Sequence, residues 1–354
     1  MAERAPSGNG SINRRASARG GWLRLAMLLV AGALAGGGAA GTATGQSVLE
    51  PASRSAERVT DLWWLMFWLG TVVFLLVMLL FLFAVTQGRR DDSQRGLDRG
   101  RRQSFVITGG VIMPLIVLAV VFGATLRTMS GLADDRSSND WTVEVVAHQY
   151  WWEVRYPDQD VVTANEIHIP VGEPVEFRLT SADVIHSFWV PELYGKVDMM
   201  PGTTTSLTVT ADEAGRFRGQ CAQLCGVQHA NMAMYVVAQE PEEFASWLEH
   251  QRQPASEPTE GSVIARGEEV FMSSSCVYCH TVRGANPAAS EFGPDLTHLA
   301  SRETIAAGIL DNNQGNLAGW ILDPQHLKPG NQMPATNLSS EELLDLLAYL
   351  MNLD

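Results

Sequence analysis

Two long uncharged stretches constrain this 354-residue chain more than any other feature of its sequence. Residues 62–86 and residues 105–126 contain no charged side chain, and about 20 apolar residues in a helix suffice to cross the hydrocarbon core of a bilayer. Trp63, Trp64 and Trp68 lie at the start of the first stretch, where indole rings favour the membrane interface. The sequence therefore predicts a hairpin of two transmembrane helices within residues 60–130, with a kink at Pro114.

The segment that joins the two stretches indicates how the hairpin is oriented. Residues 87–104 carry six Arg against three Asp, and such basic loops stay on the cytoplasmic side, so both ends of the hairpin are expected outside. Residues 1–45 resemble a signal peptide, because Arg14, Arg15, Arg19 and Arg24 lead into the apolar residues 25–40 and small residues follow at 43–45. An uncleaved membrane helix is the alternative interpretation. The expected location is a bacterial plasma membrane, with everything after the hairpin on its outer side.

Charge is distributed unevenly along the chain. The net charge is −14, yet residues 1–130 carry 14 Arg against seven acidic residues, whereas residues 131–354 carry 11 basic and 32 acidic residues. An acidic outer region repels nucleic acid and favours a basic protein partner.

A cluster of soft donor atoms follows in the outer region. Residues 221–232 read Cys-Ala-Gln-Leu-Cys-Gly-Val-Gln-His-Ala-Asn-Met, and His186 lies upstream. Thiolate and thioether donors suit copper better than zinc, and two thiolates can bridge a pair of copper ions. A disulfide between the two cysteines or a zinc site are the alternatives, although neither accounts for Met232.

These residues resemble the binuclear copper (CuA) loop of cytochrome c oxidase subunit II. The resemblance implies that the copper ligands are His186, Cys221, the backbone carbonyl of Gln223, Cys225, His229 and Met232. It also implies a cupredoxin fold, which agrees with the short alternating strands between residues 141 and 239 and predicts an antiparallel all-β sandwich over residues 137–250. Tyr150 and Trp151 match an aromatic cluster through which electrons enter the copper site, although Tyr150 stands where the family usually has Trp.

A second redox motif lies near the C-terminus. Cys276-Val-Tyr-Cys279-His280 is the attachment pattern of a c-type haem, in which both thiols bind the haem covalently and the histidine ligates iron. Met333 is the expected sixth ligand, because Pro334 indicates a loop at this position. Residues 262–354 resemble a class I, all-α cytochrome c domain, and the alternative is a zinc or thioredoxin-like Cys-x-x-Cys motif. Residues 251–261 are polar and rich in Pro, which predicts a flexible linker.

As a whole, the chain from about residue 60 onward resembles subunit II of the caa3-type oxidases, in which a cytochrome c is fused to the copper domain. The resemblance implies an oxidoreductase subunit that passes electrons from haem c to CuA and on to catalytic subunit I, with subunit III as a further partner. The expected donor is a basic cytochrome c or an upstream respiratory complex. A membrane-anchored copper-delivery protein with a haem sensor domain is the alternative.

Two positions depart from the family pattern. Gln223 replaces the Glu whose carboxylate commonly binds magnesium, so no magnesium ligand is predicted here. Residues 105–110 contain no carboxylate, although many relatives carry a Glu there at the mouth of a proton channel. Proton uptake through this chain is therefore not predicted.

Overall fold

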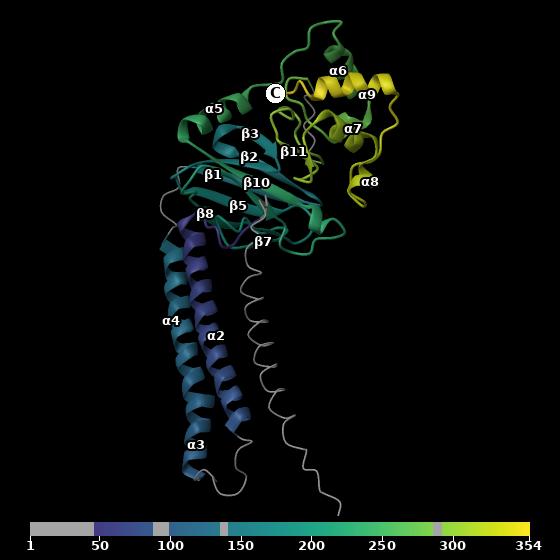
Figure 1. The fold of residues 1–354 in the computed structure, drawn as a ribbon. Coiled ribbons are helices and arrows are strands. Elements are labelled where there is room, and N and C mark those ends of the chain that lie inside the picture. The colour runs from purple at the N-terminus through teal and green to yellow at the C-terminus, as the bar shows by residue number, and fades with distance from the viewer. Residues whose placement is uncertain (1–45, 88–98, 135–140, 286–291) are drawn as a thin grey trace, which may run out of the picture. The chain divides into compact units, whose positions relative to one another are not determined.

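The computed structural model describes residues 46–87, 99–134, 141–285 and 292–354, and Figure 1 shows a pair of long helices, a strand-rich domain and a helical C-terminal domain. The predicted signal peptide lies outside the described residues. The main helices are α2 (Arg54–Gln87), α3 (Arg99–Ile107), α4 (Met113–Asp134), α5 (Pro241–Arg252), α6 (Val263–Ser273), α7 (Gln314–Leu322), α8 (Pro324–Leu327) and α9 (Ser340–Leu350). The strands are β1 (Trp141–His148), β2 (Trp151–Tyr156), β3 (Val161–Ala164), β4 (Glu166–Pro170), β5 (Val175–Ser181), β6 (His186–Phe188), β7 (Val197–Met199), β8 (Thr205–Val209), β9 (Gly215–Gln220), β10 (Ala233–Gln239), β11 (Thr304–Ile305) and β12 (Leu310–Asp311).

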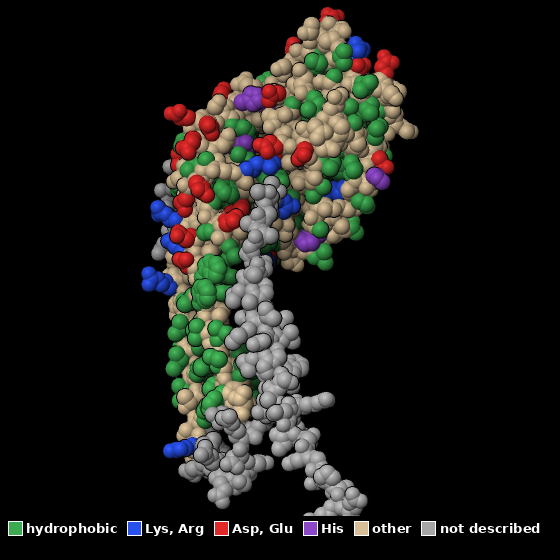
Figure 2. All heavy atoms as spheres, viewed as in Figure 1, with side chains coloured by type: hydrophobic (Ala, Val, Ile, Leu, Met, Phe, Trp, Pro, Cys, Tyr) green, Lys and Arg blue, Asp and Glu red, His purple; other side chains and the backbone are tan. Residues whose placement is uncertain are grey.

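The two apolar stretches form helices that are long enough to cross a membrane. The candidate spans run over Arg54–Thr86 and Gln103–Leu132. Their apolar side chains are exposed in the chain alone and cover the helix pair in Figure 2. A π-helical turn, η1 (Thr108–Ile112), lies just before α4 and its Pro114, where a kink was predicted. A proline lacks the N–H that would continue the regular hydrogen-bond pattern, and a wider turn accommodates this loss.

Helix α2 begins eight residues before the uncharged stretch, inside the strand-rich domain. Ser53 caps it, because its Oγ accepts a hydrogen bond from the Ala56 backbone N–H at 3.0 Å. Ala52 N–H donates to the Glu192 carbonyl at 2.8 Å, and Asp212 N–H donates to the Ala52 carbonyl at 2.9 Å. The first turns of the helix therefore belong to the strand-rich domain rather than to the membrane.

The strand-rich domain is a sandwich of two main sheets. One sheet has the strand order β3-β2-β1-β5-β8, the other has the order β4-β10-β9, and β6 pairs with β7 beside them. The expectation of a purely antiparallel sandwich is wrong, because β1 pairs with β5 in parallel and β4 pairs with β10 in parallel. Parallel neighbours require the chain to cross over between them, and in each case the intervening chain supplies strands elsewhere in the domain.

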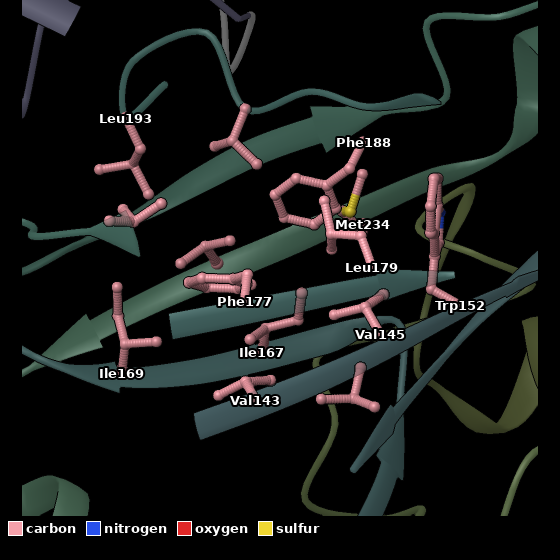
Figure 3. Close-up of a cluster of buried hydrophobic side chains, with 14 of the residues drawn as sticks. Val143, Val145, Trp152, Ile167, Ile169, Phe177, Leu179, Phe188, Leu193 and Met234 are labelled. Carbon is pink, nitrogen blue, oxygen red and sulfur yellow. The ribbon is translucent and has the colours of Figure 1, made fainter. Parts of the chain in front are cut away.

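The core of the sandwich lies between the sheets (Figure 3). Buried side chains alternate along β1 at Val143, Val145 and Ala147, as expected when one face of a strand is covered. They meet Ile167 and Met234 from the opposite sheet. The dense core fixes the ends of the strands, from which the loops with the copper motif project.

The C-terminal domain is built around helices α6 and α9. The Asp345 carbonyl carbon lies so close to Gly267 that a Cβ on Gly267 would clash with it, so glycine permits the close packing of these helices. Helix α9 begins with a capping box, in which Ser339 Oγ accepts from the Glu342 N–H and the Glu342 carboxylate accepts from the Ser339 N–H. The short β11–β12 ladder is the one strand pair in the described part of this domain.

The linker predicted over residues 251–261 begins two residues later in the structure. Helix α5 continues to Arg252, so residues 251 and 252 are helical. The chain beyond them is irregular but contacts the helical domain, since the Ala255 N–H donates to the Arg283 carbonyl at 2.8 Å and His298 Nε2 lies 3.0 Å from the Gln253 carbonyl oxygen.

Candidate metal centres

The fold gathers the soft donors of residues 221–232 beside His186. This histidine begins β6, and the motif occupies the connection between β9 and β10. Cys221 Sγ lies 3.8 Å from His186 Nδ1, and Cys225 Sγ lies 3.8 Å from His229 Nδ1. Cys225 Sγ also lies 4.0 Å from Met232 Sδ, and Cys221 Sγ lies 3.1 Å from the Gln223 carbonyl oxygen. All six predicted donors therefore face one another.

The two cysteines form no disulfide in this structure. Their sulfur atoms are 3.8 Å apart, whereas a disulfide needs about 2.05 Å. Each sulfur has its own imidazole partner, and His186, Cys221, Cys225 and Met232 are buried. Two thiolates, two imidazoles, a thioether and a carbonyl form a donor set that fits two copper ions bridged by the sulfurs and does not resemble a structural zinc site.

Residues beyond the motif orient these donors. His186 Nε2 lies 2.8 Å from Asp183 Oδ1, which leaves Nδ1 directed at Cys221. The backbone N–H groups of Val184 and Gln149 also donate to the Asp183 carboxylate, each at 2.6 Å. Burial works against the charged carboxylate, but these hydrogen bonds outweigh it and lower the pKa of Asp183. A negative charge therefore stays behind the histidine.

The two thiols titrate as a pair. The hydrogen bond between them lowers the pKa of Cys221 and raises the pKa of Cys225. A nearby positive metal would favour loss of the second proton.

Tyr150 lies against the copper loop. Its hydroxyl oxygen accepts a hydrogen bond from the Val227 N–H at 3.1 Å, and the neighbouring Gln149 Nε2 donates to the Cys225 carbonyl at 2.6 Å. Gly226 has a φ of +137°, and a Cβ there would clash with the Tyr150 hydroxyl, so only glycine fits this approach. Trp151 stacks on His148 with ring centroids 4.5 Å apart.

The second redox motif lines a cavity of about 450 Å³. Its walls include Cys276, Cys279, His280 and Met333 from the helical domain. Gln149, Tyr150 and Trp151 of the strand-rich domain also line it. The haem ligands predicted from the sequence therefore face one cavity, and the residues expected to accept electrons for copper form part of its wall.

The residues around this cavity fit a haem. His280 Nδ1 lies 2.8 Å from the Pro294 carbonyl oxygen, which assigns Nε2 as the nitrogen that would bind iron. Burial lowers the pKa of His280 and so favours the neutral imidazole that ligates metals. A Cβ on Gly293 would lie 2.8 Å from the His280 ring, so glycine leaves room for the ring. The buried Arg302 Nε has no hydrogen-bond partner among the described residues, as expected if an acidic group of the haem occupies part of the cavity.

The loop that carries Met333 is held by side chains on either side of it. The Met333 N–H donates to Asn331 Oδ1 at 2.7 Å, and Gln325 Nε2 donates to the Met333 carbonyl at 2.9 Å. Met351 instead packs against the domain core, and Met272 is exposed. Met333 is the methionine that lines the cavity.

Comparisons with known proteins agree with this division into a copper domain and a haem domain. Residues 159–239 match the family described as cytochrome c oxidase subunit II, periplasmic domain, and residues 264–354 match the cytochrome c family. A cytochrome c oxidase subunit 2 of Alkalihalophilus pseudofirmus is 39% identical over 316 residues, which cover 87% of this chain and 90% of the relative. The Bacillus subtilis protein of the same name is 33% identical and covers 87% and 91%, respectively.

Among solved structures, the periplasmic domain of cytochrome oxidase subunit II from Bradyrhizobium japonicum is 32% identical. It covers 32% of this chain and 95% of the solved chain, with a TM-score of 0.32.

The two sites and their domains define a copper- and haem-binding electron-transfer subunit anchored in a membrane. The chain belongs to the cytochrome c oxidase subunit 2 family, in the form that carries a fused cytochrome c domain. It is thus part of a haem-copper oxidase, an oxidoreductase complex in which subunit II works with catalytic subunit I. The two domains imply CuA and haem c as cofactors.

Several residues around these sites were not identified from the sequence, notably Asp183, Arg302, Glu166 and Lys328. Asp183 lies three residues before His186 and could have been found by asking which carboxylate orients that ligand. The other three carry no local sequence signal, because tertiary contacts alone bring them to the cavity or to its boundary.

Proposed function

We propose that this chain receives electrons at haem c, passes them to a binuclear copper centre and delivers them to catalytic subunit I, where oxygen is reduced to water. One observation carries the proposal: Tyr150 lines the haem cavity and also receives a hydrogen bond from the copper loop. Haem c and CuA supply reversible one-electron chemistry when bound. Tyr150 thus contacts both candidate sites.

The described residues support rapid transfer by holding both sets of ligands in place. The proposed copper ligands are His186, Cys221, the Gln223 carbonyl, Cys225, His229 and Met232, and they project from a packed sandwich. The proposed haem residues are Cys276 and Cys279 for attachment, with His280 and Met333 as axial ligands. Ligands that move little when an electron arrives reduce the reorganisation that slows transfer, and the hydrogen bonds of Asp183 and Asn331 restrict two of these groups.

The acidic surface and the basic loop support a particular cellular arrangement. We place the two redox domains on the outer face of a bacterial plasma membrane, with residues 1–45 as a signal peptide. Subunit III joins subunit I as a partner, and the electron donor is a basic cytochrome c or an upstream respiratory complex. Turnover with a separate basic cytochrome is expected to fall as salt screens its attraction to the acidic domains.

Copper delivery fits the geometry less well. A delivery protein has to release its metal, and it presents labile cysteine or methionine donors at its surface. Cys221, Cys225, His186 and Met232 are instead buried here, and Asp183 holds one of the histidines. Buried, oriented donors favour a permanent electron-transfer centre.

Rapid mixing of the purified oxidase with a reduced donor tests the proposal. Haem c absorbance is expected to show reduction first, and the near-infrared band of the copper pair is expected to bleach as haem c is reoxidised. Purification through a tag on this chain is expected to recover a large haem-containing subunit. Copper reduction that precedes haem reduction, or recovery of this chain without such a subunit, would contradict the relay.

A further inference from the structure

A buried carboxylate of the copper domain contacts the backbone of the haem domain. Glu166, at the start of β4, is 5% exposed. Its carboxylate accepts hydrogen bonds from the backbone N–H groups of Glu303 and Thr304 at 3.1 Å and 3.0 Å, and from Thr304 Oγ1 at 3.1 Å. Arg216 lies 3.6 Å from the same carboxylate and 3.1 Å from the carboxylate of Glu303. Burial raises the pKa of Glu166, although Arg302 and these donors act against the shift.

A buried ammonium group of the haem domain makes the reciprocal contact. Lys328 is 3% exposed, and its Nζ donates to the Tyr150 carbonyl of the copper domain and to the Ala306 carbonyl of its own domain, each at 3.0 Å. Burial lowers the pKa of Lys328 to about 7. Tyr150 lines the haem cavity and contacts the copper loop, so Lys328 is hydrogen-bonded to a residue that contacts both sites.

The backbone between these two charges is shaped to fit the copper domain. Ala306, Ala307 and Gly308 all have positive φ values, of 55°, 60° and 72°. Alanine rarely adopts this conformation, which strains the backbone. The turn presents the Ala307 carbonyl to the Ala233 N–H of the copper domain at 3.0 Å. A Cβ on Gly308 would lie 3.0 Å from Ala233 Cβ, so the two backbones approach closely.

We propose that Glu166 and Lys328 form a two-point latch that docks the haem domain onto its own copper domain with Tyr150 between the two cofactors. The latch deepens the proposed function, because it specifies the surface through which electrons move within the chain. Glu166 and Lys328 each have hydrogen-bond partners in the opposite domain, so separation of the domains would remove those partners. Both copper and haem domains are acidic overall, with net charges of −14 for residues 131–261 and −7 for residues 262–354, so a specific contact is needed to offset their repulsion.

Lysine labelling provides a direct test, because Lys196 and Lys328 are the two lysines in the chain. Lys196 has a side chain 51% exposed and serves as an internal reference. The purified full chain, with haem attached, is treated with an amine-acylating reagent and its peptides are analysed by mass spectrometry. Lys328 is expected to react at least about 10-fold more slowly than Lys196 in the wild-type chain, as expected for a closed interface. Equal labelling of the two lysines would overturn the latch.

Amide hydrogen exchange in variants of the full chain completes the test. In Glu166→Gln, the amides of Glu303, Thr304 and Ala233 are expected to exchange about 10- to 100-fold faster, because a charged hydrogen-bond acceptor is lost at the interface. Lys328→Met, which keeps the apolar stem, is expected to accelerate exchange at Ala233. The matched controls are Glu176→Gln, at a partly exposed side chain, and Lys196→Met, at an exposed one, and both lie outside the latch.

The haem and copper absorption spectra of each variant report whether both domains remain folded. Unchanged exchange at all three amides in spectrally intact variants would overturn the latch. These readouts need no electron transfer, so a closed interface in a chain that fails to pass electrons would refute the proposed function while leaving the latch intact.

Discussion

The copper domain and the haem domain prepare their sites in different ways. In the copper domain, a single domain supplies all six candidate donors, and four of them, His186, Cys221, Cys225 and Met232, are buried. In the haem domain, the candidate ligands line a cavity whose wall the copper domain completes, and Arg302 Nε has no hydrogen-bond partner among the described residues. The candidate copper site is therefore built by one domain, whereas the walls of the haem site come from both domains.

The largest effect is expected in the copper domain, from the loss of one bridging sulfur. Cys225→Ser is expected to convert the copper pair to a mononuclear centre and to abolish transfer beyond haem c, because serine does not replace a bridging thiolate. Electron paramagnetic resonance would then show coupling to one copper nucleus instead of two equivalent nuclei, while the haem spectrum stays unchanged. Leu224→Ala, an exposed change in the same loop, is the control. Two equivalent nuclei in Cys225→Ser would show that Cys225 is not a bridge.

The haem domain offers a smaller perturbation at Met333. Met333→Ala is expected to abolish the sulfur-to-iron charge-transfer band of the oxidised haem. The potential is expected to fall by on the order of 0.1–0.3 V, within the range of about 0.8 V that axial ligands span. Spectroelectrochemical titration measures both effects, and Met272→Ala, in an exposed position, is the control. A band that survives in Met333→Ala would assign the sixth ligand to another residue.

Acid should destabilise the copper domain through a histidine far from the ligands. Burial lowers the pKa of His168 to about 4 from 6.5, so the unfolded chain binds more protons between these values. The contribution of neutral His168 to the free energy of unfolding is thus fully present above pH 6.5. It is lost as the pH falls towards 4, and the loss is up to about 3 kcal/mol. Urea unfolding of the metal-free full chain, followed by tryptophan fluorescence, would measure this slope. His168→Gln should flatten the slope and the exposed His326→Gln should not; equal slopes in both would exclude His168 as the cause.

The smallest effect is expected at the last helix of the haem domain. Ser339→Ala removes the side chain that caps α9 and should lower the free energy of unfolding by about 1 kcal/mol. Urea titration followed by haem absorbance would detect the change without altering the copper signal. Ser340→Ala, one residue further along, keeps the capping box and is the control. Equal losses in the two variants would mean that the cap contributes nothing specific.

Most of the candidate ligands could be proposed from the sequence because they lie close together along the chain, whereas His186 and Met333 lie far from the two motifs. Cys221 to Met232 lie in one loop, and Cys276 to His280 in one turn, so spacing alone indicates the chemistry. The strand order could not be predicted in this way, because the parallel pairing of β1 with β5 depends on where the chain crosses between sheets.

The contact between the redox domains was also beyond sequence reasoning. The sequence predicted an acidic outer region and a flexible linker over residues 251–261, and neither feature specifies a contact between the two domains. The described structure instead pairs Glu166 with backbone N–H groups 137 and 138 residues away. Such a pairing depends on the shapes of both domains, and no local sequence pattern around Glu166 or Lys328 indicates it.

The start of helix α2 within the copper domain has a mechanical consequence. Ala52 is hydrogen-bonded to both Glu192 and Asp212, so the start of the membrane helix is fixed to the copper domain. An α-helix advances 1.5 Å and turns about 100° with each residue. A single residue inserted after Thr60 would thus rotate the copper domain by about 100° around the helix axis. The length of this helix therefore sets the orientation of the copper domain about the helix axis.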